Sequence, residues 1–437
     1  MLKSNGEADV YRALGNKIDK LTVRTPWDDI FHRILKELYS TEEADVVVMM
    51  PYTLSSLEKI SRVTDIEENR LHRILESLCT KGLVLDLWNE RTGRYHFMPS
   101  PLAIGIFEFT MMRTGHDYDV NSCAGLFREY FRTVYQANFS NKEQVSIMRV
   151  IPVEETIRPS EYFEFMDYEK VSSLVENAQR FSIGLCSCRN EKLHNGEKDC
   201  DMPLETCSGL GIGADYLIRH GLGREVSKAE MLENFARSRE LGLVFCADNT
   251  KRKPTAICHC CKCCCNFLAG ANKFGFVNSV VTSTFISVMR EAICTGCGKC
   301  VEFCPVNALQ LVSANDPGAP KKKKAVVDAG LCVGCGVCVS KCPVGALEMA
   351  HRSARVIHPE TTFERIILLS FERGNLQNQI FDNPKSVTQE FMRVFLGAFL
   401  RLAPVKRALM SDMFRSTFLS AARTVARVQG KGWMLDI

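Results

Sequence analysis

Residues 294–305 read CTGCGKCVEFCP, and residues 332–343 read CVGCGVCVSKCP. Both stretches have the spacing C-x-x-C-x-x-C-x-x-x-C-P. A cubane [4Fe–4S] cluster takes four thiolates at the corners of a tetrahedron. A compact loop with three cysteines supplies three of them, and the fourth comes from the other copy. The spacing therefore predicts two clusters with crossed ligation. The first set is Cys294, Cys297, Cys300 and Cys342, and the second set is Cys332, Cys335, Cys338 and Cys304.

This paired motif resembles the bacterial two-cluster ferredoxins. The resemblance implies a ferredoxin domain at residues 281–350 that carries two [4Fe–4S] clusters. A polar turn and the lysine run at 321–324 lie between the two copies and indicate a solvated insertion. Zinc or disulfides are the alternative uses of such cysteines. Zinc sites, however, do not usually repeat a four-cysteine run with a proline after the last ligand.

The composition and the first residues of the chain predict that the cysteines are in a reducing compartment. The chain has 437 residues, of which 21 are cysteines, and this length suggests roughly two to four domains. Its first residues, MLKSNGEADVYRALGNK, contain no apolar signal core. No uncharged apolar run approaches the roughly 18 residues of a membrane helix. We therefore expect a cytoplasmic protein whose clustered cysteines bind metal. Oxygen-sensitive clusters would fit an anaerobic host.

Residues 181–273 form a second cysteine-rich region, with CSCR at 186–189 and CHCCKCCC at 258–265. Neighbouring cysteines point in divergent directions, so one cluster cannot use 263, 264 and 265 together. We predict one or two further iron–sulfur clusters, closed between the 186–207 and 258–265 groups. A structural zinc site and a non-cubane catalytic cluster are the alternatives. The candidate ligands are Cys186, Cys188, Cys200, Cys207, Cys258, Cys260, Cys261, Cys263, Cys264 and Cys265, of which a subset would bind.

Together with PLETC at 203–207, these pieces resemble a group of ferredoxin-type proteins from anaerobic bacteria over residues 150–350. In that group the same elements precede a two-cluster ferredoxin. The tandem cysteines are also similar to the CCG domains of heterodisulfide reductases, but their spacing departs from that pattern. Neither resemblance implies a specific activity for this chain.

Several single residues near the cysteines have two interpretations. Arg189 either donates hydrogen bonds to cluster sulfurs or forms a surface ion pair. His259, inside the cysteine run, is expected to be a solvent-facing spacer, with metal ligation as the alternative. Cys79, Cys123 and Cys246 are expected to be small buried apolar residues.

The first part of the chain has the pattern of a small helical domain with a hairpin. A helix is predicted at 28–38, and a second begins at Ser40, where Glu43 completes a capping box. Helical spacing continues from about 55 to 78. Strands at 83–88 and 94–98 flank a polar turn at 89–93. Residues 28–115 thus resemble winged helix–turn–helix domains. They follow an N-terminal helix at 1–27 and precede a connecting α/β segment at 116–180.

The predicted recognition helix, DIEENRLHRILESLCTK at 65–81, carries more acids than arginines. Phosphate contacts supply much of the affinity for DNA, and acidic residues oppose them. The domain is therefore expected to dock a protein or cap the structure, and DNA is not an expected partner.

Residues 360–437 are predicted to form an amphipathic helical tail. The stretch FMRVFLGAFLRL at 391–402 puts five apolar residues on one helical face, namely Phe391, Val394, Phe395, Ala398 and Leu402. Pro404 ends this helix, and a basic helix follows. Such a tail either packs on the protein's own body or a second copy, which is the favoured interpretation, or lies on an anionic membrane. In the second case the protein would be peripheral on the inner face of the membrane.

These patterns together predict an α+β, multidomain chain with a winged helix, a cysteine-rich metal-binding region, a 2[4Fe–4S] ferredoxin fold and a helical C-terminal tail. The sequence has no phosphate-binding Walker loop, no flavin fingerprint and no radical-SAM motif. We therefore expect a multi-cluster electron-transfer protein, a subunit or partner of an oxidoreductase rather than a stand-alone catalyst. The alternatives are a redox-sensing winged-helix regulator and an oxidoreductase that uses the 186–265 cysteines. Association into oligomers is compatible with this sequence.

Overall fold

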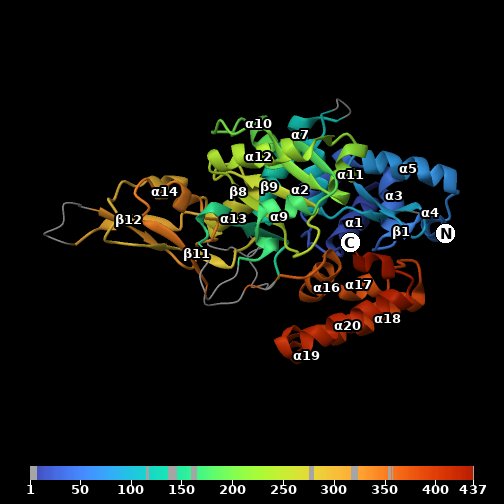
Figure 1. Ribbon diagram of the computed structural model, residues 1–437. Coiled ribbons are helices and arrows are strands. Elements are labelled where there is room, and N and C mark those ends of the chain that lie inside the picture. The colour runs from blue at the N-terminus through green and yellow to red at the C-terminus, as the bar shows by residue number, and fades with distance from the viewer. Residues whose placement is uncertain are drawn as a thin grey trace. The chain divides into compact units, whose positions relative to one another are not determined.

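The computed structural model describes residues 7–114, 118–135, 145–158, 165–274, 280–315, 323–352, 356 and 358–436. Two compact units divide the chain. Unit 1 contains residues 1–135, 216–222 and 361–437, and unit 2 contains residues 136–215 and 223–360. Helices and strands occur in both units, as the α+β class predicts (Figure 1). Among the described residues, every helix is too short or too polar to span a lipid bilayer.

Unit 1 begins with helices whose ends follow from their capping residues. The first three helices are α1 (Glu7–Asp19), α2 (Asp29–Leu38) and α3 (Thr41–Met49). The Asp28 side chain accepts a hydrogen bond from the backbone of Ile30 and caps α2. The predicted capping box of α3 is present, since Ser40 and Glu43 each accept a hydrogen bond from the other's backbone N–H. Both predicted helix starts are confirmed.

The helical pattern from 55 to 78 is broken in the structure. Its elements are β1 (Ser55–Ser56), α4 (Leu57–Thr64) and α5 (Glu68–Thr80). Asp65 stands between the helices with a left-handed φ of 62°, and the Glu67 side chain caps α5. The pattern did not reveal this break because the apolar spacing continues across it. Strands β2 (Val84–Asn89) and β3 (Arg94–Pro99) follow, and the antiparallel sheet has the order β1-β3-β2.

Further helices complete the core of unit 1. Buried aromatic residues at their contacts include Phe31, Phe107, Phe127 and Tyr130. The elements are η1 (Leu102–Ile106), α6 (Phe107–Met112), α7 (Val120–Tyr130), η2 (Phe131–Tyr135), α16 (Thr362–Glu372), α17 (Leu376–Ile380), α18 (Val387–Leu400), α19 (Ala403–Met410), α20 (Asp412–Val428) and η5 (Gly432–Asp436). The predicted basic helix after Pro404 is thus two helices, α19 and α20.

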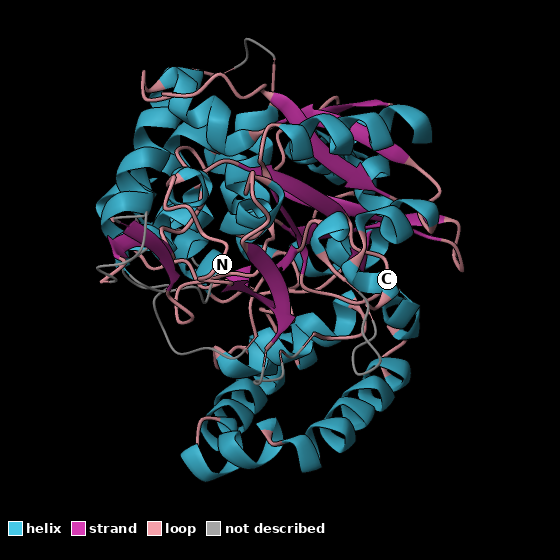
Figure 2. Cartoon of the chain, turned by 60° about the vertical axis from the view of Figure 1, so that its left-hand side comes forward, coloured by secondary structure: helices cyan, strands magenta, loops and turns pink. Residues whose placement is uncertain are grey.

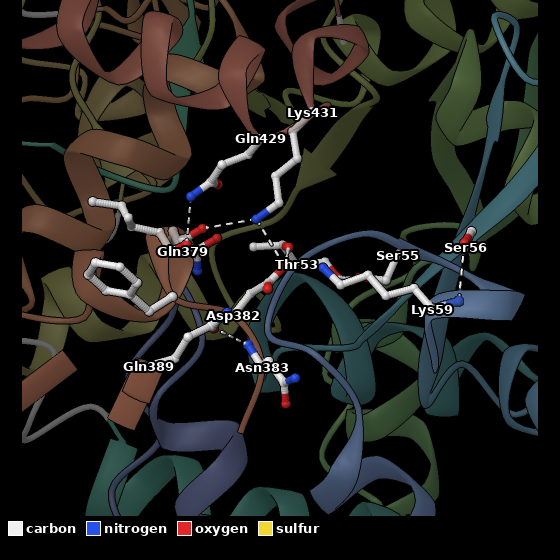
Figure 3. Close-up of polar contacts among 12 residues, drawn as sticks. Thr53, Ser55, Ser56, Lys59, Gln379, Asp382, Asn383, Gln389, Gln429 and Lys431 are labelled. Carbon is white, nitrogen blue, oxygen red and sulfur yellow. Dashed lines mark hydrogen bonds and ion pairs between the residues drawn. The ribbon is translucent and has the colours of Figure 1, made fainter. Parts of the chain in front are cut away.

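A buried carboxylate ties the C-terminal helices to the first part of unit 1. Asp382, between α17 and α18, accepts hydrogen bonds from Thr53 Oγ1 at 2.6 Å and Lys59 Nζ at 2.7 Å. Lys431 Nζ lies 2.9 Å from the same carboxylate. Figure 3 shows these groups converging on Asp382. The tail therefore packs onto the N-terminal part of unit 1 through this cluster.

The apolar face of α18, however, is not covered by the chain. Phe391 is 69% exposed and Val394 is 70% exposed, and the same helix face continues through other exposed residues. These are Val387, Phe395, Ala398, Phe399 and Leu402. The expectation that this face packs on the protein's own body is wrong for these side chains. The aligned apolar face itself is present as predicted.

Unit 2 is built on a seven-stranded sheet with the order β10-β4-β8-β9-β6-β5-β7. Figure 2 shows the strands of the protein in magenta and the helices in cyan. Its pairs are antiparallel except for β10 with β4. The strands are β4 (Met148–Ile151), β5 (Phe181–Leu185), β6 (Glu205–Leu210), β7 (Gly223–Glu225), β8 (Val244–Asp248), β9 (Ala256–Cys260) and β10 (Val280–Val281). The described residues of the connecting α/β segment predicted at 116–180 include β4 and a helix at Val171–Glu176, which ends before β5.

Helices pack against this sheet and connect its strands. Buried apolar residues of α12, such as Met231 and Phe235, share a core with Phe245 and Ile257 of the sheet. Helix α12 is capped by Ser227, whose side chain accepts a hydrogen bond from the backbone N–H of Glu230. The helices and turns are η3 (Glu154–Thr156), η4 (Asp167–Glu169), α9 (Val171–Glu176), α10 (Ser187–His194), α12 (Lys228–Glu240) and α13 (Asn266–Phe274). Helix α11 (Ile212–Arg219) begins in unit 2, and its residues from 216 on belong to unit 1.

The repeated cysteine motif forms a small module within unit 2. Strand β11 (Phe285–Met289) pairs with β14 (Leu347–His351), and β12 (Leu309–Ser313) pairs with β13 (Lys323–Val327). Each motif carries one short helix, α14 (Lys299–Phe303) in the first copy and α15 (Val337–Ser340) in the second. In Figure 1, α14 and β12 mark this module.

Candidate metal centres

The first predicted set of cysteines surrounds one pocket. All four thiols line it, and Pro343 and Leu347 are among the apolar residues around it. The four thiols are Cys294, Cys297, Cys300 and Cys342. The structure therefore brings the last cysteine of the second copy to the loop of the first copy. Metal binding by this set remains a prediction.

The second set surrounds a matching pocket. It is lined by Cys332, Cys335, Cys338 and Cys304. Here the last cysteine of the first copy meets the loop of the second. The cysteines of this pocket are only 5–8% exposed. In the first set, by contrast, Cys297 is exposed and Cys342 is half-buried. The thiols of the first pocket thus reach solvent at Cys297, whereas all four thiols of the second pocket are buried, and for that reason we call the second one the enclosed pocket.

Glycines in the loops allow the thiols to converge. Gly296 has a φ of 70° and Gly334 a φ of 68°, both in the left-handed region that favours glycine. A Cβ atom on Gly296 would lie 2.2 Å from the carbonyl oxygen of Lys323. A Cβ atom on Gly334 would lie 2.0 Å from the carbonyl oxygen of Phe285. The strand behind each loop therefore leaves room for glycine alone.

Backbone N–H groups point at several of these sulfurs. Ala308 N lies 3.1 Å from Cys304 Sγ, and Ala346 N lies 3.2 Å from Cys342 Sγ. In the enclosed pocket, the Ser287 hydroxyl lies 3.3 Å from Cys338 Sγ. Burial raises the pKa of the Cys338 thiol to about 12, so binding a metal there would release a proton. Hydrogen bonds of this kind stabilise the extra negative charge of a reduced cluster.

Four cysteines of the other cysteine-rich region converge on one point. The ligand atoms of Cys200, Cys261, Cys263 and Cys264 all lie within 4.8 Å of one another. We call these four residues the outer thiol group. Cys264 is fully buried against Leu243, whereas Cys263 is exposed. The pKa of Cys261 falls to about 5, chiefly because its thiolate accepts a hydrogen bond from Cys264.

A second group of thiols lies across the strands of the sheet. Cys246 on β8 is paired in register with Cys258 on β9. The pKa of Cys258 lies well below its usual value because its thiolate accepts hydrogen bonds from Cys207 and Cys260. The pKa of Cys265 is lowered likewise by Cys188 and Cys260. We call these six residues the inner thiol group: Cys188, Cys207, Cys246, Cys258, Cys260 and Cys265.

Cys246 is the member of this group that the sequence interpretation missed. It is buried, as predicted, but its neighbours are not all apolar. It also contacts Cys260, another member of the inner thiol group. Only the register between β8 and β9 reveals this, and register is not visible in a single strand's sequence. Cys186, a predicted ligand, is half-buried near Cys258 and Cys261, and burial raises its pKa to about 12.

His259 faces away from the thiols. Its side chain is 1% exposed, with Nε2 2.9 Å from Ser208 Oγ and Nδ1 2.7 Å from Ser238 Oγ. The ring stacks on Phe235, and burial lowers its pKa to about 3. The expectation of a solvent-facing spacer is wrong. Alternate residues of a strand point to opposite faces, so Cys258 and Cys260 share one face while His259 occupies the core on the other.

Arg189 is fully buried, so the surface ion pair is excluded. Its Nη1 donates to the Pro203 carbonyl at 2.6 Å and to Thr206 Oγ1 at 2.7 Å, and its Nη2 donates to the His259 carbonyl. Burial alone would lower its pKa, but the neighbouring thiolates of Cys186 and Cys261 more than offset this and raise it. The guanidinium thus supplies positive charge beside the cysteines.

A third cluster of potential ligands lies in unit 1. Cys79, Asp86 and His220 come within 4.8 Å of one another. Asp86, however, already accepts from Arg219 at 2.8 Å and from His220 Nε2 at 2.9 Å. This arrangement is a buried ion pair. Cys79 and Cys123 are buried, as predicted.

Comparison with known proteins agrees with the pockets of the module. Residues 293–346 match the model of the 4Fe-4S dicluster domain. Neither the curated proteins nor the solved structures contain a match to the chain. The matched segment spans both cysteine motifs, and a further cysteine-rich region with a metal-compatible thiol group precedes it. These findings identify the chain as an iron–sulfur protein.

Proposed function

We propose that the chain is a multi-cluster electron-transfer protein that serves as a subunit or partner of an oxidoreductase. The observation that carries this proposal is the pair of four-thiol pockets within one module. Cubane clusters in such pockets exchange single electrons. The protein sets their potential through burial and through hydrogen bonds to sulfur. Here the chain supplies eight thiols that are held in place, and backbone N–H groups that donate hydrogen bonds to some of their sulfur atoms.

The difference between the pockets indicates which of the two clusters would exchange electrons with a partner protein. The first pocket has exposed thiol surface at Cys297, and Val344, which is 42% exposed, lines the same pocket. Ile293, the residue before Cys294, is also 42% exposed. Weak electron-transfer complexes use small contact areas, and an apolar rim around an exposed cluster suits such a contact. The second pocket is enclosed, and Cys335 O accepts from Val153 N at 3.0 Å, next to β4 of the sheet. We place the partner at the first pocket.

The test is a redox titration of the anaerobically purified full-length protein. Two cubanes contribute about eight iron atoms per chain, and both should be reduced in one-electron steps that electron paramagnetic resonance can follow. Cys342→Ala should remove the signal of the cluster held by Cys294, Cys297 and Cys300 and leave the other intact. The control is Cys123→Ala, a buried cysteine outside the module. Loss of the second cluster instead, or a chain without reducible iron, would contradict the proposal.

We further propose that residues 28–115 form a winged helix used for protein docking. The order of helices α3 to α5 and the β2–β3 hairpin supports this assignment. On α5, Arg70 already pairs with Glu42 at 2.5 Å, so one of its few cations is neutralised. A DNA-binding role would show as a salt-sensitive, sequence-specific complex in fluorescence anisotropy at physiological ionic strength. We expect none with the cluster-loaded or the metal-free protein.

For the C-terminal tail we propose contact with an anionic membrane surface. The apolar face of α18 is exposed, and exposed cations flank the helices at Lys385, Arg401, Arg407 and Arg427. An amphipathic helix of this kind lies in the headgroup region with its apolar face inward. Association of two copies through the same face is the competing arrangement.

A further inference from the structure

The outer thiol group differs in geometry from the two ferredoxin pockets. We propose that Cys200, Cys261, Cys263 and Cys264 bind one structural zinc ion and take no part in an iron–sulfur cluster. The proposal is independent of the electron-transfer function, because it concerns thiols outside the ferredoxin module.

The spacing of the sulfur atoms supports a single tetrahedral ion. Sγ of Cys263 lies 3.7 Å from Sγ of Cys261 and 3.6 Å from Sγ of Cys264. Sγ of Cys200 lies 3.8 Å from Sγ of Cys264. A zinc ion with four sulfur ligands at about 2.3 Å has sulfur–sulfur edges of about 3.8 Å, because a regular tetrahedron's edge is about 1.63 times its centre-to-corner distance. These three sulfur–sulfur distances match this value, and all four sulfurs lie within 4.8 Å of one another.

A cubane would require a wider arrangement. In a [4Fe–4S] cluster each thiolate binds a different iron at a corner of the cube. The four sulfurs therefore stand outside the cube and cannot approach van der Waals contact. The same protein provides a comparison. Among the described cysteines, no three sulfurs of either ferredoxin set come within the 4.8 Å that unites the outer thiol group.

The local backbone explains why neighbouring cysteines can share this ion. Strand β9 ends at Cys260, and residues 262–264 form a turn. The turn is closed by a hydrogen bond from Cys265 N to Cys261 O at 3.4 Å. In a turn, adjacent side chains need not diverge as they do in a strand. Cys263 and Cys264 thus reach the same point, while Cys265 joins the inner thiol group.

The site has the closed character of a structural zinc centre. Four thiolates fill the coordination sphere and leave no open position for a substrate. Three ligands come from the turn after β9, and Cys200 comes from the loop after α10. Met202 and Leu241 pack beside them. The ion would tie this loop to the turn. The guanidinium of Arg189, beside Cys261, would partly balance the net negative charge of a zinc ion with four thiolates.

The test uses the anaerobically purified full-length protein. Elemental analysis should find one zinc per chain, and zinc-edge X-ray absorption should show four sulfur neighbours at about 2.3 Å with no nearby iron. Cys263→Ser, at an exposed position, should reduce the zinc content several-fold and leave the iron content unchanged. The matched control is Lys262→Ala in the same turn, which should retain the zinc.

Several outcomes would overturn the proposal. They are zinc bound by oxygen or nitrogen, a chain without zinc, a single iron bound by the four sulfurs, or loss of iron and sulfide in Cys263→Ser. If that variant does not fold, the absorption spectrum of the unaltered protein still decides, because ligand type and distance are read from it directly.

Discussion

At the scale of single residues, the second ferredoxin pocket has a hydroxyl group beside a thiol, and the matching position of the first pocket has none. Ser287 and Ala325 occupy matching positions in the repeat. Each lies two residues beyond the carbonyl that its motif glycine approaches, and each lines its own pocket. The Ser287 hydroxyl is 3.3 Å from Cys338 Sγ, whereas Ala325 has no donor to offer. The clusters are therefore expected to differ in potential for a reason that one substitution can isolate.

Ser287→Ala should lower the potential of the enclosed cluster alone. A hydrogen bond to a ligand sulfur favours the more negative, reduced state. If its strength changes by about 1 kcal/mol between the two states, the shift is about 40 mV for a one-electron couple. A spectroscopic redox titration measures it, and the other cluster is the internal reference. Ser340→Ala, whose hydroxyl instead donates to the Val337 carbonyl, should shift neither. Equal shifts of both clusters would refute this interpretation.

At the scale of elements, the attachment of the C-terminal helices depends on one carboxylate. Burial alone would raise the pKa of Asp382, but the charges of Lys431 and Lys59 lower it to about 2 (Figure 3). Because the folded pKa is below the unfolded value near 4, Asp382 stabilises the fold above pH 4. This contribution is lost as the pH falls from about 4 to about 2.

Asp382→Asn should therefore destabilise the protein by about 2 kcal/mol at pH 7, the free energy that corresponds to this pKa shift. The measurement is denaturant unfolding of both proteins, followed by far-ultraviolet circular dichroism, at several pH values. The difference between them should shrink below pH 4. Asp167→Asn is the control, since Asp167 is 81% exposed and its ion pair with Lys170 contributes little. A difference that is constant with pH would exclude this role for the charge.

The tail gives a second prediction at this scale. Full-length protein should float with anionic vesicles, and protein truncated after residue 385 should not. Flotation should weaken with salt, because the exposed cations contribute through electrostatic attraction. Phe391→Ser with Phe395→Ser should abolish it as well, since both side chains are exposed and their loss should not disturb the core. If the protein does not float with vesicles and truncation instead dissociates a dimer, the apolar face of α18 joins two copies of the chain.

Local spacing determined how much of this architecture was predictable. The crossed cysteine sets and the capping box at Ser40 depend on residues a few positions apart, and the structure has both arrangements. The environments of Cys246 and His259 depend on which strands pair and in which register, and a single sequence does not contain that information. The break at Asp65 was hidden because both helices keep their apolar residues in phase.

At the scale of the whole molecule, the metal content should distinguish three kinds of site, namely the ferredoxin pockets, the inner thiol group and the outer thiol group. If the inner thiol group holds one cubane, the full chain carries about twelve iron atoms, eight of them in the ferredoxin module. Replacing Cys258 and Cys260 together by alanine should remove about four iron atoms, because both lie within that group. Zinc should be unaffected. Iron and zinc analysis of the same samples measures this, with Cys79→Ala as the buried control outside both groups. About eight iron atoms in the unaltered protein would show that the inner thiol group holds no cubane.

The path of the chain through its two units bears on how the protein is made. The chain passes between them after residues 135, 215, 222 and 360. Domains tend to fold in the order in which the ribosome produces them. Unit 2 is complete once residue 360 has emerged, with all the cysteines of the motifs available, while unit 1 still awaits residues 361–437. Cofactor delivery to the nascent chain can therefore precede the final closure of unit 1, and a translation pause near residue 360 would lengthen that interval.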